Sequence, residues 1–182
     1  MGAKITDIGL GVKIIEPDKF EDYRGYYSEI FSERTMANLG IDMKVVQDNE
    51  AFSAKKGTVR GIHFQNYPKA QAKLLRCLKG KIIDVAVDLR KNSSTYKQYV
   101  MVVLEENDCK YIYIPKGFGH CCISLVDNTV INYKVDELYD KSLDRAIRFD
   151  DPEIGIEWPI SEFIVSEKDK ASPLLKDSDV NF

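Results

Sequence analysis

The chain has 182 residues, a formal net charge of -3, and 44% hydrophobic and 30% charged residues. These values are typical of a soluble globular protein, and we expect one domain over residues 1–182. The slightly acidic balance argues against nonspecific nucleic-acid binding, which needs a basic surface. No apolar run approaches the ~20 residues of a membrane-spanning helix, so neither nucleic acid nor membrane is an expected partner.

The predicted elements are one helix followed by a series of strands. Residues 32–40, SERTMANLG, are the best helix candidate, because Ser32 can cap the helix and Gly40 can end it. Segments rich in β-branched and aromatic residues predict strands at 59–65, 73–78, 81–89, 99–105, 111–115 and 129–135. Turn signals separate these segments. Closely spaced strands without helical periodicity predict a mainly β antiparallel barrel or jelly roll.

Alternation along the strands predicts which side chains point together. Within 81–89, two groups face opposite ways: Ile83, Val85, Val87 and Leu89 against Ile82, Asp84, Ala86 and Asp88. Within 59–65, residues 59, 61, 63 and 65 are expected to share one face. His63, Lys73 and Tyr133 lie on three different strands. We expect them to converge in one cavity, because the mouth of such a barrel is a common ligand site.

The chain has only two histidines, and both lie in distinctive segments: His63 in VRGIHFQ and His120 in PKGFGH. Pro115 to His120 is similar to one half of the cupin motif, P-x-G-x-x-H. The other half would be His63-Phe64-Gln65, in which glutamine stands where metal-binding cupins carry a second histidine. A three-histidine centre is impossible with two histidines, so we expect no metal. His120 is then either a ligand-binding residue or a hydrogen-bonded barrel histidine.

The four cysteines also argue against a metal site. No pair has C-x-x-C spacing, and adjacent Cys121 and Cys122 cannot easily ligate one ion. The first thirty residues lack the continuous apolar core of a secretory signal. Four thiols without such a signal are typical of the reducing cytoplasm, where we expect the protein.

Eight segments, in the same order, resemble the dTDP-4-dehydrorhamnose 3,5-epimerase family, metal-free cupins that epimerise nucleotide-linked 4-keto sugars. They are DYRGYYSEIF (22–31), VVQDNEAFS (45–53), GTVRGIHFQ (57–65), QAKLLRCLKGKIIDVAVDLR (71–90), YIPKGFGHCCISL (113–125), INYKVDELYD (131–140), IRFDDPEIGIEWP (147–159) and SEKDKASPLL (166–175). The resemblance implies a cupin-type jelly-roll barrel with a few short helices and a cofactor-independent isomerase.

The resemblance also implies roles for individual residues. His63 would be the general base, Asp169 the carboxylate that orients it, Tyr133 the proton donor on the other face of the sugar, and Lys73 the group that stabilises the enolate oxygen. The residues expected to bind nucleotide or sugar are Phe20, Arg24, Glu29, Gln47, Asp48, Asn49, Arg60, His120, Tyr139, Asp144 and Lys168. A homodimer is implied, in which N-terminal strands cross to the partner so that Phe20 and Arg24 serve the neighbouring site.

The chemistry of a 4-keto sugar calls for these residue types. A hydrogen beside a ketone is removable when a base of near-neutral pKa takes it and a cation stabilises the enolate oxygen, which histidine and lysine supply. Inversion requires that a proton return on the opposite face, and Tyr133 is the predicted donor. Asp169 would fix the tautomer of His63 and stabilise its imidazolium form.

Some positions depart from the usual pattern of the family and leave the substrate open. Cys121-Cys122 stands where glycine and an aromatic residue are usual, and Asp144 stands where glutamate is common. The substrate would be a dTDP-4-keto-6-deoxyhexose or a GDP-linked 4-keto heptose or hexose for a surface polysaccharide, inverted at carbon 3, carbon 5 or both. Alternative interpretations are a ketoisomerase, a non-catalytic sugar-nucleotide-binding cupin and a metal-dependent oxygenase.

Overall fold

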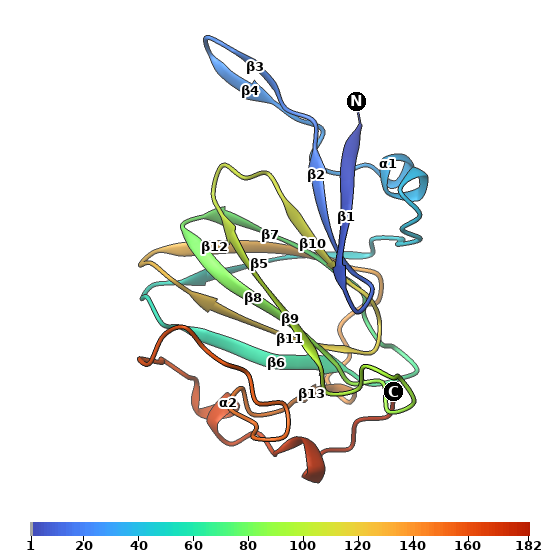
Figure 1. Ribbon diagram of the computed structural model, residues 1–182, viewed down its shortest axis with the longest axis vertical. Coiled ribbons are helices and arrows are strands. Elements are labelled where there is room, and N and C mark those ends of the chain that lie inside the picture. Colours follow the sequence, from blue (N-terminus) through green and yellow to red (C-terminus); the bar gives the residue numbers. More distant parts are fainter. Residues whose placement is uncertain (1) are drawn as a thin grey trace.

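The structure, a computed structural model, describes residues 2–182 and consists mainly of antiparallel strands in two facing sheets (Figure 1). One sheet has six strands in the order β1-β2-β10-β7-β12-β5, and the other has five in the order β13-β6-β11-β8-β9. Strands β3 and β4 form a separate hairpin that projects from one end of the molecule (Figure 1). The predicted mainly β architecture is confirmed, while one domain over 1–182 stays a prediction.

The six-stranded sheet comprises β1 (Ala3–Gly9), β2 (Val12–Pro17), β10 (Tyr111–Ile114), β7 (Lys73–Lys79), β12 (Thr129–Val135) and β5 (Gln47–Ser53). The five-stranded sheet comprises β13 (Asp144–Ala146), β6 (Val59–Gln65), β11 (Phe118–Ser124), β8 (Lys81–Asp88) and β9 (Tyr99–Glu105). The hairpin is β3 (Phe20–Asp22) and β4 (Gly25–Tyr27), and the helical segments are α1 (Glu33–Asn38), α2 (Glu167–Lys170) and the short 3-10 helix η1 (Leu175–Asp177). Within residues 2–182, no helix has the length and apolar character needed to span a membrane.

Apolar side chains from both sheets meet between them and form the barrel interior. Leu75, Ile112 and Ile131 come from the six-stranded sheet, and Ile82 and Ala86 come from β8 of the other. The opposite face of β8, with Ile83, Val85 and Val87, belongs to a second cluster, which also contains Leu89 directly after the strand. The alternation predicted for 81–89 is therefore confirmed, because a strand between two apolar layers must present both of its faces to a core.

Chain segments outside the barrel cover the outer face of each sheet. The segment after β13, which includes Ile147, Ile154 and Leu175, packs on the five-stranded sheet. Helix α1 packs on the six-stranded sheet through Met36. Ser32 caps α1 by accepting a hydrogen bond from the amide of Thr35, and Gly40 has a φ of 74° just beyond its end. The predicted cap and stop are both confirmed.

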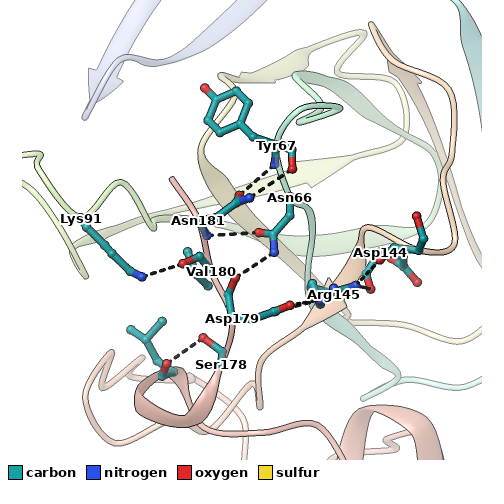
Figure 2. A network of polar contacts seen from close by, with 11 residues as sticks. Asn66, Tyr67, Lys91, Asp144, Arg145, Ser178, Asp179, Val180 and Asn181 are labelled. Carbon is teal, nitrogen blue, oxygen red and sulfur yellow. Dashed lines mark hydrogen bonds and ion pairs between the residues drawn. The ribbon is translucent and has the colours of Figure 1, made fainter.

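Polar contacts tie the C-terminal segment to the connection after β6 (Figure 2). The side chains of Asn66 and Asn181 bind the backbone of each other's segment: Asn66 Nδ2 donates to the carbonyl of Asp179 at 2.9 Å, and Asn181 Oδ1 accepts from the amide of Tyr67 at 2.9 Å. Arg145 of β13 donates to the carboxylate of Asp179 at 2.8 Å (Figure 2). These contacts join the C-terminal segment to both strands, and pairing of β13 with β6 places Asp144 beside Gln65.

Strand β6 departs from the regular alternation predicted for it. Its register with β11 shifts between the pairs His120–His63 and Cys122–Arg60. A Cβ on Gly61, which has a φ of 126°, would overlap the backbone of His120 and Cys121. The prediction that residues 59, 61, 63 and 65 share one face is therefore wrong: the bulge turns Val59 into the outer cluster and brings Arg60 to the same cavity as His63.

A buried carboxylate organises the turn after β8. Asp88 is fully buried and accepts hydrogen bonds from Arg90 Nε (2.8 Å), Ser93 Oγ (2.8 Å) and Thr95 Oγ1 (2.6 Å). Burial opposes ionisation of this carboxyl, yet the hydrogen bonds prevail and lower the pKa of Asp88 to about 2.

We expect Asp88→Ala to lower the free energy of unfolding at pH 7 by about 2 kcal/mol, because several donors lose their acceptor. The pKa of Asp88 in the folded state lies below its unfolded value. Its contribution is therefore present above about pH 4 and is lost as the pH falls toward the folded value. Urea unfolding at several pH values measures the difference, and equal midpoints for both proteins at pH 7 would contradict it.

Candidate active site

A cavity of about 220 Å³ between the two sheets contains the side chains predicted to be catalytic on the strands. Its walls are formed by Ala51, Arg60, His63, Lys73, His120, Cys122, Ile131 and Tyr133. The predicted convergence of His63, Lys73 and Tyr133 is observed, because β6, β7 and β12 each direct one of these side chains inward. Arg60 and His120 join them.

His63 is paired with a carboxylate from the far end of the chain. Nε2 of His63 lies 2.7 Å from Oδ1 of Asp169, which is 5% exposed and belongs to α2. Ser166 caps α2 through the amide of Asp169 and so fixes the position of this residue. Burial opposes ionisation of Asp169, but the hydrogen bond and charge of His63 outweigh it and lower the pKa of Asp169. An ionised carboxylate here holds Nε2 of His63 as the protonated ring nitrogen.

Lys73 brings an ammonium group to a buried site. The residue is only 8% exposed, and burial lowers its pKa to about 8. The negative charges of Asp84 and Asp144 oppose this shift. At neutral pH the group is therefore still largely cationic, and in a cavity of low dielectric its charge acts strongly on an anion.

Tyr133 has the properties of a neutral proton donor. Burial raises the pKa of its phenol, and the positive charge of Arg60 opposes this effect only in part. Its backbone carbonyl accepts a hydrogen bond from Asn49 Nδ2 at 3.3 Å, which ties β12 to β5. The phenol thus keeps its proton at neutral pH while facing the same cavity as His63.

A second histidine–aspartate pair lies at this cavity, with His120 in its wall and Asp84 bound to His120. Nε2 of His120 is 2.8 Å from Oδ2 of Asp84, and both residues are buried. Sequence reasoning named His120 but missed Asp84. The signal was present, because alternation along 81–89 places Asp84 on the inward face with Ile82 and Ala86.

A neighbouring cavity of about 350 Å³ shares Arg60 and His63 with the first. Lys168 and Asp169 also line it, together with Thr58, Val59, Ile164, Val165 and Ser166. Lys168 Nζ lies 2.9 Å from Oδ2 of Asp144, and the hydroxyl of Tyr139 lies 3.4 Å from the same oxygen. Four of the predicted binding residues therefore lie at or beside this cavity: Arg60, Lys168, Asp144 and Tyr139.

Other predicted binding residues occupy different positions. Gln47 and Asn49 share the inward face of β5, and Gln47 accepts a hydrogen bond from the amide of Tyr139 at 3.0 Å. Asp48 points to the opposite face, where it binds Lys134 at 2.6 Å. Asp48 therefore does not face the cavity of its own chain, because strand alternation turns it outward, and its role in binding nucleotide or sugar stays a prediction.

Three more predicted residues lie on the N-terminal side, away from the cavity of their own chain. Phe20 and Arg24 are on the exposed β3–β4 hairpin, where Nη2 of Arg24 lies 2.5 Å from Oδ2 of Asp22. Glu29 accepts a hydrogen bond from the hydroxyl of Thr35 at 2.7 Å, beside α1. The position of Gln65 is also informative: its amide binds the backbone of Leu138 and Asp140 and so braces the loop after β12.

Comparisons with known proteins assign this geometry to a family. The sequence model of dTDP-4-dehydrorhamnose 3,5-epimerase matches residues 6–177. A curated dTDP-4-dehydrorhamnose 3,5-epimerase of Sinorhizobium fredii is 46% identical over 172 residues, which cover 94% of this chain and 88% of the relative.

Solved structures agree in fold. The dTDP-4-dehydrorhamnose 3,5-epimerase of Bacillus anthracis, with TDP and PPi bound, is 40% identical, has a TM-score of 0.92 and covers 95% of this chain and 99% of its own. The dTDP-6-deoxy-D-glucose-3,5-epimerase of Legionella pneumophila, in complex with dTDP-4-keto-L-rhamnose, is 37% identical with a TM-score of 0.91 and covers 97% of this chain and 95% of its own. The predicted cupin-type fold is thereby confirmed, and the chain belongs to the dTDP-4-dehydrorhamnose 3,5-epimerase family of isomerases.

Proposed function

We propose that the protein inverts carbons 3 and 5 of a dTDP-linked 4-keto-6-deoxyhexose by enolate formation, in the synthesis of a surface polysaccharide sugar. The observation that carries this proposal is the convergence of His63, Lys73 and Tyr133 in one buried cavity, with Asp169 behind His63. The dTDP compounds bound in the solved relatives support a thymidine nucleotide over a guanosine nucleotide. The free and buried state of all four cysteines supports the cytoplasm as its compartment.

Each inversion begins with His63 as the base. The ring nitrogen that does not face Asp169 takes the proton from the carbon beside the ketone, and the electron pair of the broken C–H bond moves to the carbonyl oxygen. Asp169 stabilises the imidazolium that forms, since it lies 2.7 Å from Nε2. Lys73 stabilises the enolate oxygen as a buried cation.

Tyr133 completes the inversion from the other face of the ring. Its hydroxyl gives a proton to the carbon, the electron pair of the enolate forms the new C–H bond, and the ketone is restored. The phenolate recovers its proton and His63 loses one before the next inversion, so atoms and electrons balance without an oxidant or reductant.

The neighbouring cavity of about 350 Å³ is the proposed binding place for the nucleotide part of the substrate. Arg60 and Lys168 are two cations on its wall, which suits a diphosphate. Tyr139 is 56% exposed beside Asp144 and offers an aromatic face to the base. We assign contacts with the sugar to His120 and Asp144, and contacts with the nucleotide to Arg60, Lys168 and Tyr139.

We further propose a homodimer in which the β3–β4 hairpin of each protomer completes the site of its partner. The hairpin leaves the barrel (Figure 1) and exposes aromatic side chains, among them Phe20 at 50% and Tyr27 at 62%. Such a patch is typical of an interface. Arg24, Glu29 and Asp48, which do not reach the cavity of their own chain, would then act across the interface.

Mixing Arg24→Ala protein with His63→Ala protein tests this arrangement. If Arg24 serves the partner's site, mixed dimers regain activity, because one of their two sites has both native residues. Sedimentation of a 20.8 kDa species would contradict the dimer, and mixtures that stay as inactive as their components would contradict the exchange of Arg24.

Deuterium uptake tests the proposed reaction. The protein is incubated in deuterium oxide with dTDP-linked and GDP-linked 4-keto sugars, and uptake is followed by mass spectrometry and NMR. Uptake at both carbons with the dTDP sugar alone supports the proposal. Uptake at carbon 3 alone would identify a C3-only epimerase, a displaced keto group a ketoisomerase, and binding without uptake a non-catalytic cupin.

Substitution of Tyr133 by phenylalanine separates proton removal from inversion. We expect Tyr133→Phe to lower the rate of product formation by about 10²-fold, the usual contribution of a general acid. Deuterium exchange into recovered substrate continues, because His63 still removes and returns a proton on its own face. NMR of recovered substrate and product measures both rates. Wild-type rates of inversion would contradict the role of Tyr133.

A further inference from the structure

The aspartate of the second histidine–aspartate pair has an unusual environment. Oδ2 of Asp84 lies 2.8 Å from Nε2 of His120. Asp84 is completely buried, and its other oxygen, Oδ1, has no hydrogen-bond partner among residues 2–182. Burying half of a carboxylate without a partner is costly, and such atoms require an explanation in a native structure. The position therefore points to a function beyond packing.

The place of Asp84 in the barrel limits what it can do. On β8 it shares the inward face with Ile82 and Ala86, and in the ladder it lies opposite Cys122 of β11. Cys122 lines the cavity, whereas Asp84 does not. Asp84 therefore points into the barrel beside Cys122 but is completely covered by its neighbours, so it acts through the side chains that line the cavity.

Two of those side chains carry or can carry positive charge. His120 is bound to Asp84 directly, and Lys73 lines the same cavity. Burial lowers the pKa of Lys73 to about 8, and Asp84 is the strongest of the negative charges that oppose this shift.

Other titratable groups around Lys73 do not replace Asp84. They come from four strands: Arg60 and His63 of β6, His120 and Cys122 of β11, Tyr133 of β12 and Asp144 of β13. Among them Asp144 is the other carboxylate, and it is already paired with Lys168 at 2.9 Å. Cys122 has its pKa raised by burial and by Asp84, so it stays a neutral thiol. Asp84 is thus the carboxylate left to balance Lys73.

We propose that Asp84 is a positioning residue for the reaction: it orients His120 through the hydrogen bond to Nε2, and it places the unpaired oxygen of a buried carboxylate beside the cavity that Lys73 lines. The carboxylate of Asp84 selects the His120 tautomer with the proton on Nε2, so Nδ1 is the ring nitrogen left for other contacts. The same charge allows a buried lysine to stay cationic where the enolate oxygen forms. The inference rests on the proposed function for its consequence in catalysis, but its electrostatic part does not.

Competitive labelling tests the electrostatic part without any substrate. Wild-type and Asp84→Asn proteins are treated with a trace of acetic anhydride over a range of pH, and acetylation of Lys73 is measured by peptide mass spectrometry. We expect the midpoint of Lys73 labelling to fall by about one pH unit in Asp84→Asn, because the variant loses a negative charge that raises the pKa of Lys73. An unchanged midpoint would overturn the proposal.

Asp88→Asn is the matched control. Asp88 is equally buried, lies on the same strand and face, and has Arg90, Ser93 and Thr95 as its partners. We expect this variant to lose stability and to leave the midpoint of Lys73 unchanged. A similar shift in both variants would mean that general loosening of β8 exposes Lys73, which would overturn a specific role of Asp84.

A pH profile tests the consequence in catalysis. The alkaline limb of kcat for dTDP-sugar epimerisation is expected to move to lower pH in Asp84→Asn by the same amount as the labelling midpoint. A lower kcat with an unmoved limb would overturn the role of Asp84 toward Lys73. If wild-type protein shows no deuterium uptake, the proposed function fails, while the labelling result still decides the electrostatic part.

A second measurement keeps the proposal testable if Asp84→Asn does not fold. In wild-type protein labelled with carbon-13 at aspartate carboxyls, the resonance assigned to Asp84 is expected to be that of a carboxylate at pH 7. A protonated carboxyl at that pH would overturn the proposal, because a neutral Asp84 cannot balance Lys73.

Discussion

Replacing His63 by alanine is expected to lower kcat by about 10³-fold and to abolish deuterium uptake at both carbons, because the variant lacks the base that opens each inversion. The side chain of His63 is 34% exposed and belongs to the cavity wall, so its removal leaves the barrel interior intact. Wild-type uptake in His63→Ala would contradict the assignment of the base.

Two comparisons make the His63 result specific. Asp169→Asn keeps the base but weakens its orientation, and we expect a loss of about 10- to 100-fold, as for other residues that hold a functional histidine. Added imidazole is expected to restore part of the activity of His63→Ala and none of that of Asp169→Asn. Thermal unfolding of both variants reports whether the losses come from the fold, and rescue of both or neither would contradict the division of roles.

Replacing Lys73 by methionine is expected to lower kcat by about 10²- to 10³-fold, the usual effect of removing one group that stabilises a developing oxyanion. Methionine has similar length and no charge, so the buried site is filled and relieved of the cost of a desolvated ammonium. Urea unfolding is therefore expected to show equal or greater stability. A less stable variant with wild-type kcat would show that Lys73 has a structural role instead.

The pKa of Lys73 adds an expectation for wild-type protein. Because burial lowers this pKa to about 8, the ammonium form is lost as the pH rises through that value. Activity is therefore expected to fall along an alkaline limb near pH 8, and Lys73→Met is expected to lack that limb. Initial rates measured from about pH 6 to about pH 10 give both profiles. The upper limit is close to the ordinary pKa of lysine.

Elements of the fold that depend on neighbouring residues could be predicted from the sequence. The cap and stop of α1 require only Ser32 and Gly40, and the two faces of β8 follow from its period of two. The sequence ranges predicted as strands do not include β1, β2, β3, β4, β5, β11 or β13. All seven residues of β11 are buried, so FGHCCIS lacks the alternation of apolar residues with exposed polar residues that marks a half-buried strand.

For the candidate site too, some features follow from the sequence and others only from the tertiary structure. The types of its residues and their strands determined that an imidazole, an ammonium and a phenol would meet in one barrel, and the family pattern supplied their roles. The structure decided which of them meet. The bulge at Gly61 brings Arg60 beside His63, alternation turns Asp48 outward, and the pairs His63–Asp169 and His120–Asp84 join positions 106 and 36 residues apart. Sequence patterns determine local geometry because capping and alternation are short-range. Only packing of distant strands decides which charges share one buried cavity, and thereby their pKa values.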